Sequence, residues 1–233
     1  MTLRWLTADG AVAAVMVGAL VFWGAGASGV ALLALFFVSG SLLTEWNERQ
    51  RREKRQKRQG NRRNEAEAPL PPPPLLPPLR NARQVLANGG WAAAGALVVP
   101  WRPDLGWAVL LGSLATAQAD TWATEIGAHA ARPPRLITTA RPVPAGTSGG
   151  VTPLGTGAGA LGATLLAGLG LWLGVPLRIA ALGTLVGVFG MMVDSVLGAT
   201  LEGDGRLDND GVNLAATSVG ALASVALTQV VGA

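Results

Sequence analysis

The sequence predicts an all-α fold: one polytopic transmembrane helical bundle of about seven spans, formed as a single domain over residues 1–233. Half of the residues are apolar and only 14% are charged, too few to cover a soluble domain of this length. Six long windows contain no charge, and about 20 apolar residues suffice to cross a bilayer. The predicted spans are roughly 10–25, 29–45, 84–101, 105–125, 154–174, 178–199 and 211–231.

Small residues support this interpretation of the apolar windows. The chain has 32 glycines, and close-packed membrane helices use small residues where they touch. A glycine-rich stretch at 24–29 predicts the turn between the first two spans. The chain has no cysteine and a single histidine, His129, which excludes disulfides, thiolate metal sites and multi-histidine metal centres.

The distribution of lysine and arginine predicts the orientation. Eleven of the 18 basic residues lie between Glu45 and Arg83, which places the loop 46–80 in the cytoplasm. Alternation of the spans then places the loops 130–153 and 200–210 on the same side. We therefore expect an integral protein of a prokaryotic inner (plasma) membrane whose polar site faces the cytoplasm.

The loop 46–80 contains a basic run at 48–63 and a proline-rich run at 69–78. We interpret it as a solvated helical extension followed by a polyproline spacer, peripheral to any chemistry. Attraction of the basic run to anionic lipid headgroups is the alternative. No aromatic residues interleave with the basic ones, so we predict no nucleic-acid binding.

Three acids fall within or at the edges of predicted spans. An ionised side chain at membrane depth costs about 2.5–3.5 kcal/mol on insertion scales, so Asp120, Glu125 and Asp194 are candidate catalytic residues. An interhelical hydrogen bond or a pair with an arginine is the structural alternative for each. Asp194 continues a glycine stripe, so it lies on the face where helices approach most closely. The stripe comprises Gly183, Gly187, Gly190 and Gly198.

The segment 142–156 is rich in glycine, serine and threonine and precedes a predicted helix. Glycines allow backbone amides to turn inward and bind an anion, and the positive end of the next helix adds to this. Arg135 and Arg141 stand just upstream and are suited to neutralise phosphate. A simple surface turn is the alternative, but beside buried acids the segment favours a phosphate site.

The segment 204–213 carries several acids and amides. One interpretation is an exposed loop in which Asn209 and Asp210 cap the last helix. The other is contact with a nucleotide or with magnesium, since Mg²⁺ binds a few carboxylates and takes its other ligands from water and phosphate.

Six ordered motifs resemble one known family. They are NARQVLANG (81–89), ADTWATEIG (119–127), RLITT (135–139), VPAGTSGGV (143–151), DSVLGAT (194–200) and NDGVN (209–213). The chain resembles the membrane protein family that includes the phytyl-phosphate kinases of tocopherol synthesis, and is more distantly similar to dolichol and phytol kinases and membrane CTP transferases. The resemblance implies phosphoryl transfer from a nucleoside triphosphate, typically CTP, to an isoprenyl monophosphate such as phytyl or geranylgeranyl phosphate, giving the diphosphate.

The resemblance and the residue chemistry together assign roles to individual residues of this membrane protein. A homo-oligomer is compatible with the sequence. Asp120 and Asp194 are expected to hold Mg²⁺, with Glu125 in support. The residues expected to bind substrate or nucleotide are Arg83, Asn88, Thr121, Arg135, Thr138, Thr139, Arg141, Gly146, Thr147, Ser148, Gly149, Gly150, Ser195, Asn209, Asp210 and Asn213.

Two other functions stay open from the sequence. A cytidylyltransferase would place CMP on a lipid phosphate, and residue types cannot distinguish attack on the α-phosphorus from attack on the γ-phosphorus. A secondary transporter would keep carboxylates near the midplane of the bilayer. The acids here lie at span ends on one side, and no inverted repeat is visible, which favours an enzyme.

Overall fold

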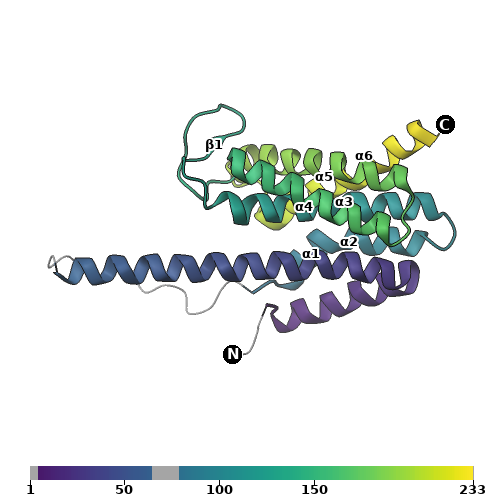
Figure 1. Ribbon diagram of the computed structural model, residues 1–233, viewed down its shortest axis with the longest axis horizontal. Helices are drawn as coiled ribbons and strands as arrows, with labels where there is room; N and C mark the ends of the chain where they lie inside the picture. Colours follow the sequence, from purple (N-terminus) through teal and green to yellow (C-terminus); the bar gives the residue numbers. More distant parts are fainter. Residues whose placement is uncertain (1–4, 65–78, 233) are drawn as a thin grey trace.

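The computed structural model describes residues 5–64 and 79–232, with side chains of the first segment described as far as Lys54. The described chain is almost entirely helical (Figure 1). Its elements are α1 (Ala8–Asn64), α2 (Ala82–Val98), α3 (Pro103–Gly127), β1 (Arg135–Leu136), β2 (Gly150–Val151), α4 (Pro153–Trp172), α5 (Leu177–Leu197), the π-helical turn η1 (Gly198–Glu202) and α6 (Asn209–Gly232). The predicted all-helical class is confirmed, with one small hairpin added.

Helix α1 consists of two arms that meet at Gly26. This residue has φ 61° and ψ −155°, a conformation that L side chains rarely adopt, so the helical backbone breaks there. Figure 1 shows the chain doubling back at this point. The turn expected at 24–29 is therefore present. The second arm does not end where the membrane span was predicted to end, but continues as helix to Asn64. The proline-rich run at 69–78 lies outside the described residues.

Within the described part of the chain, four helices are long and apolar enough to cross a membrane: Ala8–Lys54 of α1, Pro153–Trp172, Leu177–Glu202 and Asn209–Val231. Helix α2 has only 17 residues, and α3 buries Ser113, Thr116 and Gln118 against the protein rather than exposing apolar side chains to lipid. A polytopic helical membrane protein is thus supported, whereas the count of seven spans stays a prediction.

Helix α3 is the centre of the bundle. It packs against α1, α2, α4, α5 and α6, and its middle, from Leu110 to Ala119, is buried throughout. The buried residues include many small side chains, which allow neighbouring backbones to come close. In contrast, α1 exposes large apolar side chains such as Val15, Phe22 and Trp23, as expected for a lipid-facing surface.

The glycine stripe of α5 is the contact with α3. A Cβ on Gly183 would lie 3.0 Å from the Leu111 side chain, and one on Gly190 would lie 2.3 Å from Thr116 Oγ1. Residue numbers rise together along both helices, so α3 and α5 run parallel. One helical turn beyond these contacts, the same faces carry Asp120 and Asp194.

We predict that Gly187→Leu lowers the unfolding temperature in detergent by several degrees. A Cβ at this position would lie 2.9 Å from the Ala115 carbonyl oxygen, and overpacking of this kind costs about 1–3 kcal/mol. Gly168→Leu is the matched control, because no atom lies within 4 Å of the Cβ position at Gly168. Thermal melting followed by size-exclusion chromatography measures both. Equal losses in the two variants would contradict the close contact.

Candidate active site

A cavity of about 680 Å³ opens at one end of the bundle. Helices α1, α3, α4, α5 and α6, the turn η1 and the loop between α3 and α4 all contribute to its lining. Figure 1 shows that this loop, which carries β1, and the far end of α1 lie at the same end of the molecule. The cavity therefore gathers segments that are distant in the sequence.

Carboxylates form the inner wall of the cavity. Asp120 of α3 and Asp194 of α5 lie within hydrogen-bonding reach of each other, and Glu202 of η1 is near both. Oδ2 of Asp194 is buried and has no hydrogen-bond partner among the described residues. Carboxylates held this close repel each other unless a proton or a cation lies between them. The pair can therefore share a proton or hold a cation.

The donor set fits magnesium rather than a metal held by protein ligands alone. Among residues 5–64 and 79–232, no three or more His, Cys, Asp and Glu side chains cluster closely enough to hold a metal ion. Mg²⁺ is commonly held by one or two carboxylates and completes its shell with water and substrate phosphate. Asp120 and Asp194, with an unpartnered Asp194 oxygen, meet that requirement.

The glycine-rich loop, residues 146–150, forms another part of the lining. Gly149 has φ 75° and packs against the end of α5, where a Cβ would lie 2.5 Å from the Ser195 carbonyl oxygen. The N–H groups of Thr147 and Gly150 donate within the loop, and the Thr147 hydroxyl donates to the Pro144 carbonyl at 2.8 Å. Among the described residues, the N–H groups of Ser148 and Gly149 have no hydrogen-bond acceptor, and Gly149 N lies 3.1 Å from the Cβ position of Gly198.

The amino-terminal end of α4 borders the same loop. Thr152 is its N-cap and accepts a hydrogen bond from Gly155 N at 3.0 Å, and Pro153 begins the helix. Thr152, Gly155 and Thr156 all line the cavity. The positive end of the helix dipole therefore adds to the field that an anion would meet there.

The structure brings only part of the predicted site to this cavity. Asp120, Asp194, Ser195, Asn209 and the residues Gly146, Thr147, Ser148, Gly149 and Gly150 line it. The predicted residues outside the lining are Arg83, Asn88, Thr121, Glu125, Arg135, Thr138, Thr139, Arg141, Asp210 and Asn213.

Several of these outlying side chains have other partners. Arg135 donates to the Ala140 carbonyl at 2.8 Å and so stabilises its own loop. Asn88 donates to the Gln84 carbonyl at 3.1 Å within α2. Thr121 faces α1, since a Cβ on Gly40 would lie 3.0 Å from its methyl group. The two arginines expected to neutralise phosphate, Arg135 and Arg141, are thus not part of the cavity wall.

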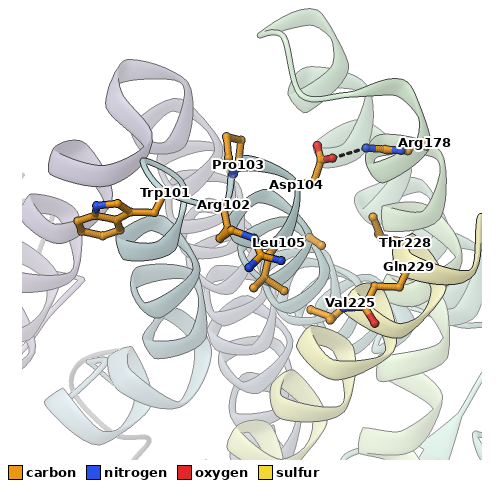
Figure 2. Close-up of a pocket in the computed structure, with 10 residues that line it drawn as sticks. Trp101, Arg102, Pro103, Asp104, Leu105, Arg178, Val225, Thr228 and Gln229 are labelled. Atoms are coloured by element: carbon orange, nitrogen blue, oxygen red, sulfur yellow. Dashed lines mark hydrogen bonds and ion pairs between the residues drawn. The ribbon is translucent and has the colours of Figure 1, made fainter. Parts of the chain in front are cut away.

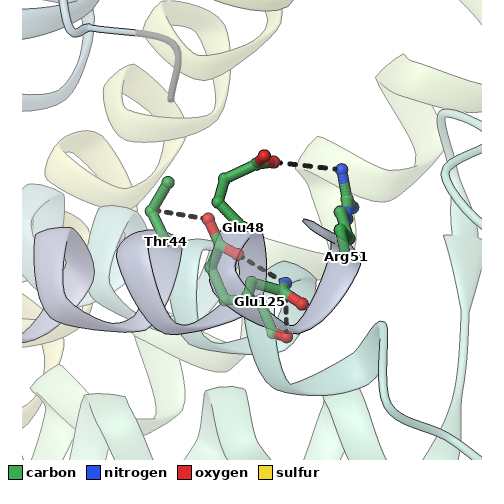
Figure 3. Close-up of polar contacts among 5 residues, drawn as sticks. Thr44, Glu48, Arg51 and Glu125 are labelled. Atoms are coloured by element: carbon green, nitrogen blue, oxygen red, sulfur yellow. Dashed lines mark hydrogen bonds and ion pairs between the residues drawn. The ribbon is translucent and has the colours of Figure 1, made fainter. Parts of the chain in front are cut away.

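Glu125 joins α3 to α1 (Figure 3). Its carboxylate accepts hydrogen bonds from Thr44 Oγ1 at 2.5 Å and Asn47 Nδ2 at 2.7 Å. Asn47 Nδ2 also donates to the Glu125 carbonyl at 3.0 Å. Asn47 is itself buried and lines the cavity. Glu125 therefore orients a cavity residue through an interhelical hydrogen bond.

The cap of α6 differs from the expectation. Asp208, rather than Asn209 or Asp210, accepts a hydrogen bond from Gly211 N at 2.9 Å. Its other oxygen pairs with Arg83 at 2.7 Å. These hydrogen bonds, that from Gly211 first, hold the pKa of the Asp208 carboxyl below its usual value. Asn209 therefore does not cap the helix; it lines the cavity instead.

Five ionisable side chains in the lining were not predicted as site residues: Arg51, Lys54, His129, Arg132 and Glu202. An ideal α-helix leaves residues eight apart, such as Asp194 and Glu202, roughly 80° apart around its axis. The wider π-helical turn between them changes that angle and brings Glu202 toward the acid pair. No sequence pattern predicts that turn.

Arg51 and Lys54, however, lie four and seven residues after Asn47, a spacing that places all three on one helical face and that can be recognised in the sequence.

A second cavity, of about 480 Å³, lies near the start of α3 (Figure 2), whereas the first cavity lies at the end of that helix. It is bordered by the α2–α3 turn and the ends of α5 and α6. Its one carboxylate, Asp104, is paired with Arg178, and no glycine-rich loop reaches it. This cavity lacks both walls that make the first one suited to phosphate.

The fold and the site define a polytopic integral membrane protein with a polar cavity, lined by both acidic and basic side chains, at one end of its bundle. Over residues 1–221 the chain matches the family model described as integral membrane protein DUF92, and it belongs to that family. No solved structure matches the chain.

Three relatives illustrate the range of the family. The chain is 39% identical over 148 residues to an uncharacterized membrane protein of Methanocaldococcus jannaschii (63% of this chain, 61% of the relative). It is 31% identical over 205 residues to Protein PGR of Arabidopsis thaliana (75% and 65%). It is 30% identical over 236 aligned residues to Protein VTE6, chloroplastic, of the same plant (96% and 66%). The chain thus spans just under two thirds of the length of these curated relatives.

We predict that Glu125→Ala lowers the free energy of unfolding by about 1–3 kcal/mol, because Thr44 and Asn47 lose the acceptor for their partly buried hydrogen bonds. Glu53→Ala, on the exposed side of α1, serves as the control and should change stability little. Denaturant or thermal melts in detergent measure both. An unchanged melting curve for Glu125→Ala would show that these hydrogen bonds do not hold α1 against α3.

Proposed function

We propose that this protein is a membrane-embedded phosphotransferase. It transfers a phosphoryl group from a nucleoside triphosphate, with CTP the expected donor, to an isoprenyl monophosphate such as phytyl or geranylgeranyl phosphate, and the product is the diphosphate. The observation that carries the proposal is the meeting of Asp120 and Asp194, from two helices, with the loop 146–150 in one cavity.

The chemistry requires little beyond alignment and charge neutralisation. An oxygen of the isoprenyl phosphate attacks the γ-phosphorus, the bond from that phosphorus to the β–γ bridging oxygen breaks, and the nucleoside diphosphate leaves with the electron pair. The acceptor is already an anion, so no strong general base is needed.

Two walls of the cavity have separate tasks in this proposal. Asp120 and Asp194 would hold Mg²⁺, which when bound would neutralise charge on the triphosphate and orient it. The free N–H groups of Ser148 and Gly149 and the amino-terminal end of α4 would bind phosphate oxygens. Holding donor and acceptor together in this way lowers the entropic part of the barrier.

The relatives and the membrane setting support the substrate class. The sequence motifs resemble those of phytyl-phosphate kinases, and Protein VTE6 aligns with 96% of this chain. The apolar surface of the bundle would let an isoprenyl tail remain in the bilayer while its phosphate enters the cavity. The excess of lysine and arginine in the second arm of α1 supports a cytoplasmic opening of the cavity.

Replacing either acid of the pair should abolish turnover. We predict that Asp120→Asn and Asp194→Asn each lower kcat by about a thousandfold or more, because the loss of a charged metal ligand removes electrostatic stabilisation of the transition state. Asp104→Asn, at the second cavity, is the matched control and should keep normal activity. Purified protein, Mg²⁺, CTP or ATP and a panel of isoprenyl phosphates provide the assay.

The products decide between the two enzyme classes. Release of nucleoside diphosphate with formation of an isoprenyl diphosphate supports the kinase. Release of pyrophosphate with formation of a nucleotidyl lipid would replace it by a cytidylyltransferase. Normal turnover in either Asp120→Asn or Asp194→Asn would contradict the metal assignment.

A further inference from the structure

Residues 46–64 form a polar extension of α1. We propose that the first two turns of this extension are part of the site, and that Arg51 and Lys54 bind the phosphate chain of the donor nucleotide. The inference rests on the proposed function and deepens it. It also changes the role expected for this segment, which the sequence presented as peripheral.

The extension presents one face to the cavity. Asn47, Gln50, Arg51 and Lys54 line it, and their spacing of three, four and seven residues from Asn47 places them on one side of a helix. Arg49 lies on another side of the helix, where it pairs with Glu45 at 2.5 Å, and it does not line the cavity. The basic residues are thus sorted: some face the cavity and others face away from it.

Hydrogen bonds fix this face in place. Thr44 and Asn47 are bonded to Glu125 of α3, so the helix cannot rotate about its axis without breaking them. Glu48 then pairs with Arg51 at 3.4 Å, one turn further on (Figure 3). Arg51 and Lys54 are consequently held at the mouth of the cavity, while their exposed ends stay available to a ligand.

A triphosphate bound in this cavity needs cations besides magnesium to compensate its charge. Its inner wall carries the carboxylates of Asp120, Asp194 and Glu202, and the arginines first expected to offset phosphate, Arg135 and Arg141, are not in the lining. A magnesium ion offsets the acid pair but leaves most of the charge of a triphosphate uncompensated. Together with Arg132, the two cations of the extension supply that compensation within the lining.

The same cations could instead meet anionic lipid headgroups, but the geometry favours the cavity. Headgroup attraction is sequence-tolerant and would recruit basic residues on any exposed face of the extension, Arg49 included. Only a ligand inside the cavity distinguishes Arg51 and Lys54 from Arg49. This difference supplies the test.

The experiment compares the double variant Arg51→Ala/Lys54→Ala with Arg49→Ala in full-length protein. Binding of magnesium tripolyphosphate is measured by calorimetry in nanodiscs of neutral lipid and in nanodiscs containing anionic lipid, and the KM for nucleotide is measured separately. We expect the double variant to weaken tripolyphosphate binding and to raise the KM about tenfold, with kcat little changed. Arg49→Ala should match the parent protein, and Arg51→Lys/Lys54→Arg should restore most of the binding.

Each outcome bears on a different claim. Unchanged binding and KM in the double variant overturn the inference, even if the parent protein phosphorylates isoprenyl phosphates. Equal losses in the double variant and Arg49→Ala, or a loss seen only in discs containing anionic lipid, also overturn it in favour of headgroup attraction. Selective loss of tripolyphosphate binding supports the inference, even if no isoprenyl phosphate is turned over and the proposed kinase fails.

Discussion

The close approach of α3 and α5 is the contact on which the rest of the site depends. Glycines of α5 lie against the Leu111–Thr116 stretch of α3, so the two backbones run side by side at a distance that larger side chains would forbid. The next turn of each helix then places Asp120 and Asp194 face to face. The packing of the two helices thus holds the two carboxylates close together.

The other walls of the cavity contribute groups that can offset the negative charge of Asp120 and Asp194. The loop 146–150 and the start of α4 bring backbone N–H groups, and α1 brings Arg51 and Lys54 through the hydrogen bonds that Glu125 accepts. Acids, amides and bases thus come from different helices and converge in one cavity. Under the proposed function, this arrangement would hold a cation and a polyanion together, because the cavity offers both acidic and basic side chains.

The sequence predicted those features whose signal is local. The break at Gly26 follows from a glycine cluster between apolar runs, and the position of Asp194 follows from the spacing of glycines along one helix. The hydrogen bond of Arg135 could not be predicted from the sequence, because its acceptor is a backbone carbonyl within a folded loop. Glu202 depends on a π-helical turn, and the cavity-facing side of α1 depends on which of its faces meets α3. Both are set by tertiary packing.

The most direct test of the central claim is the distance between the two acids in the membrane. The chain has no cysteine, so Asp120→Cys/Asp194→Cys introduces the only thiols. Oxidative cross-linking, followed by proteolysis and mass spectrometry, should recover peptides of α3 and α5 joined by a disulfide, whereas Asp104→Cys/Asp194→Cys should give none. Failure of the first pair to cross-link, in protein that is otherwise folded and inserted, would contradict the convergence on which the site is built.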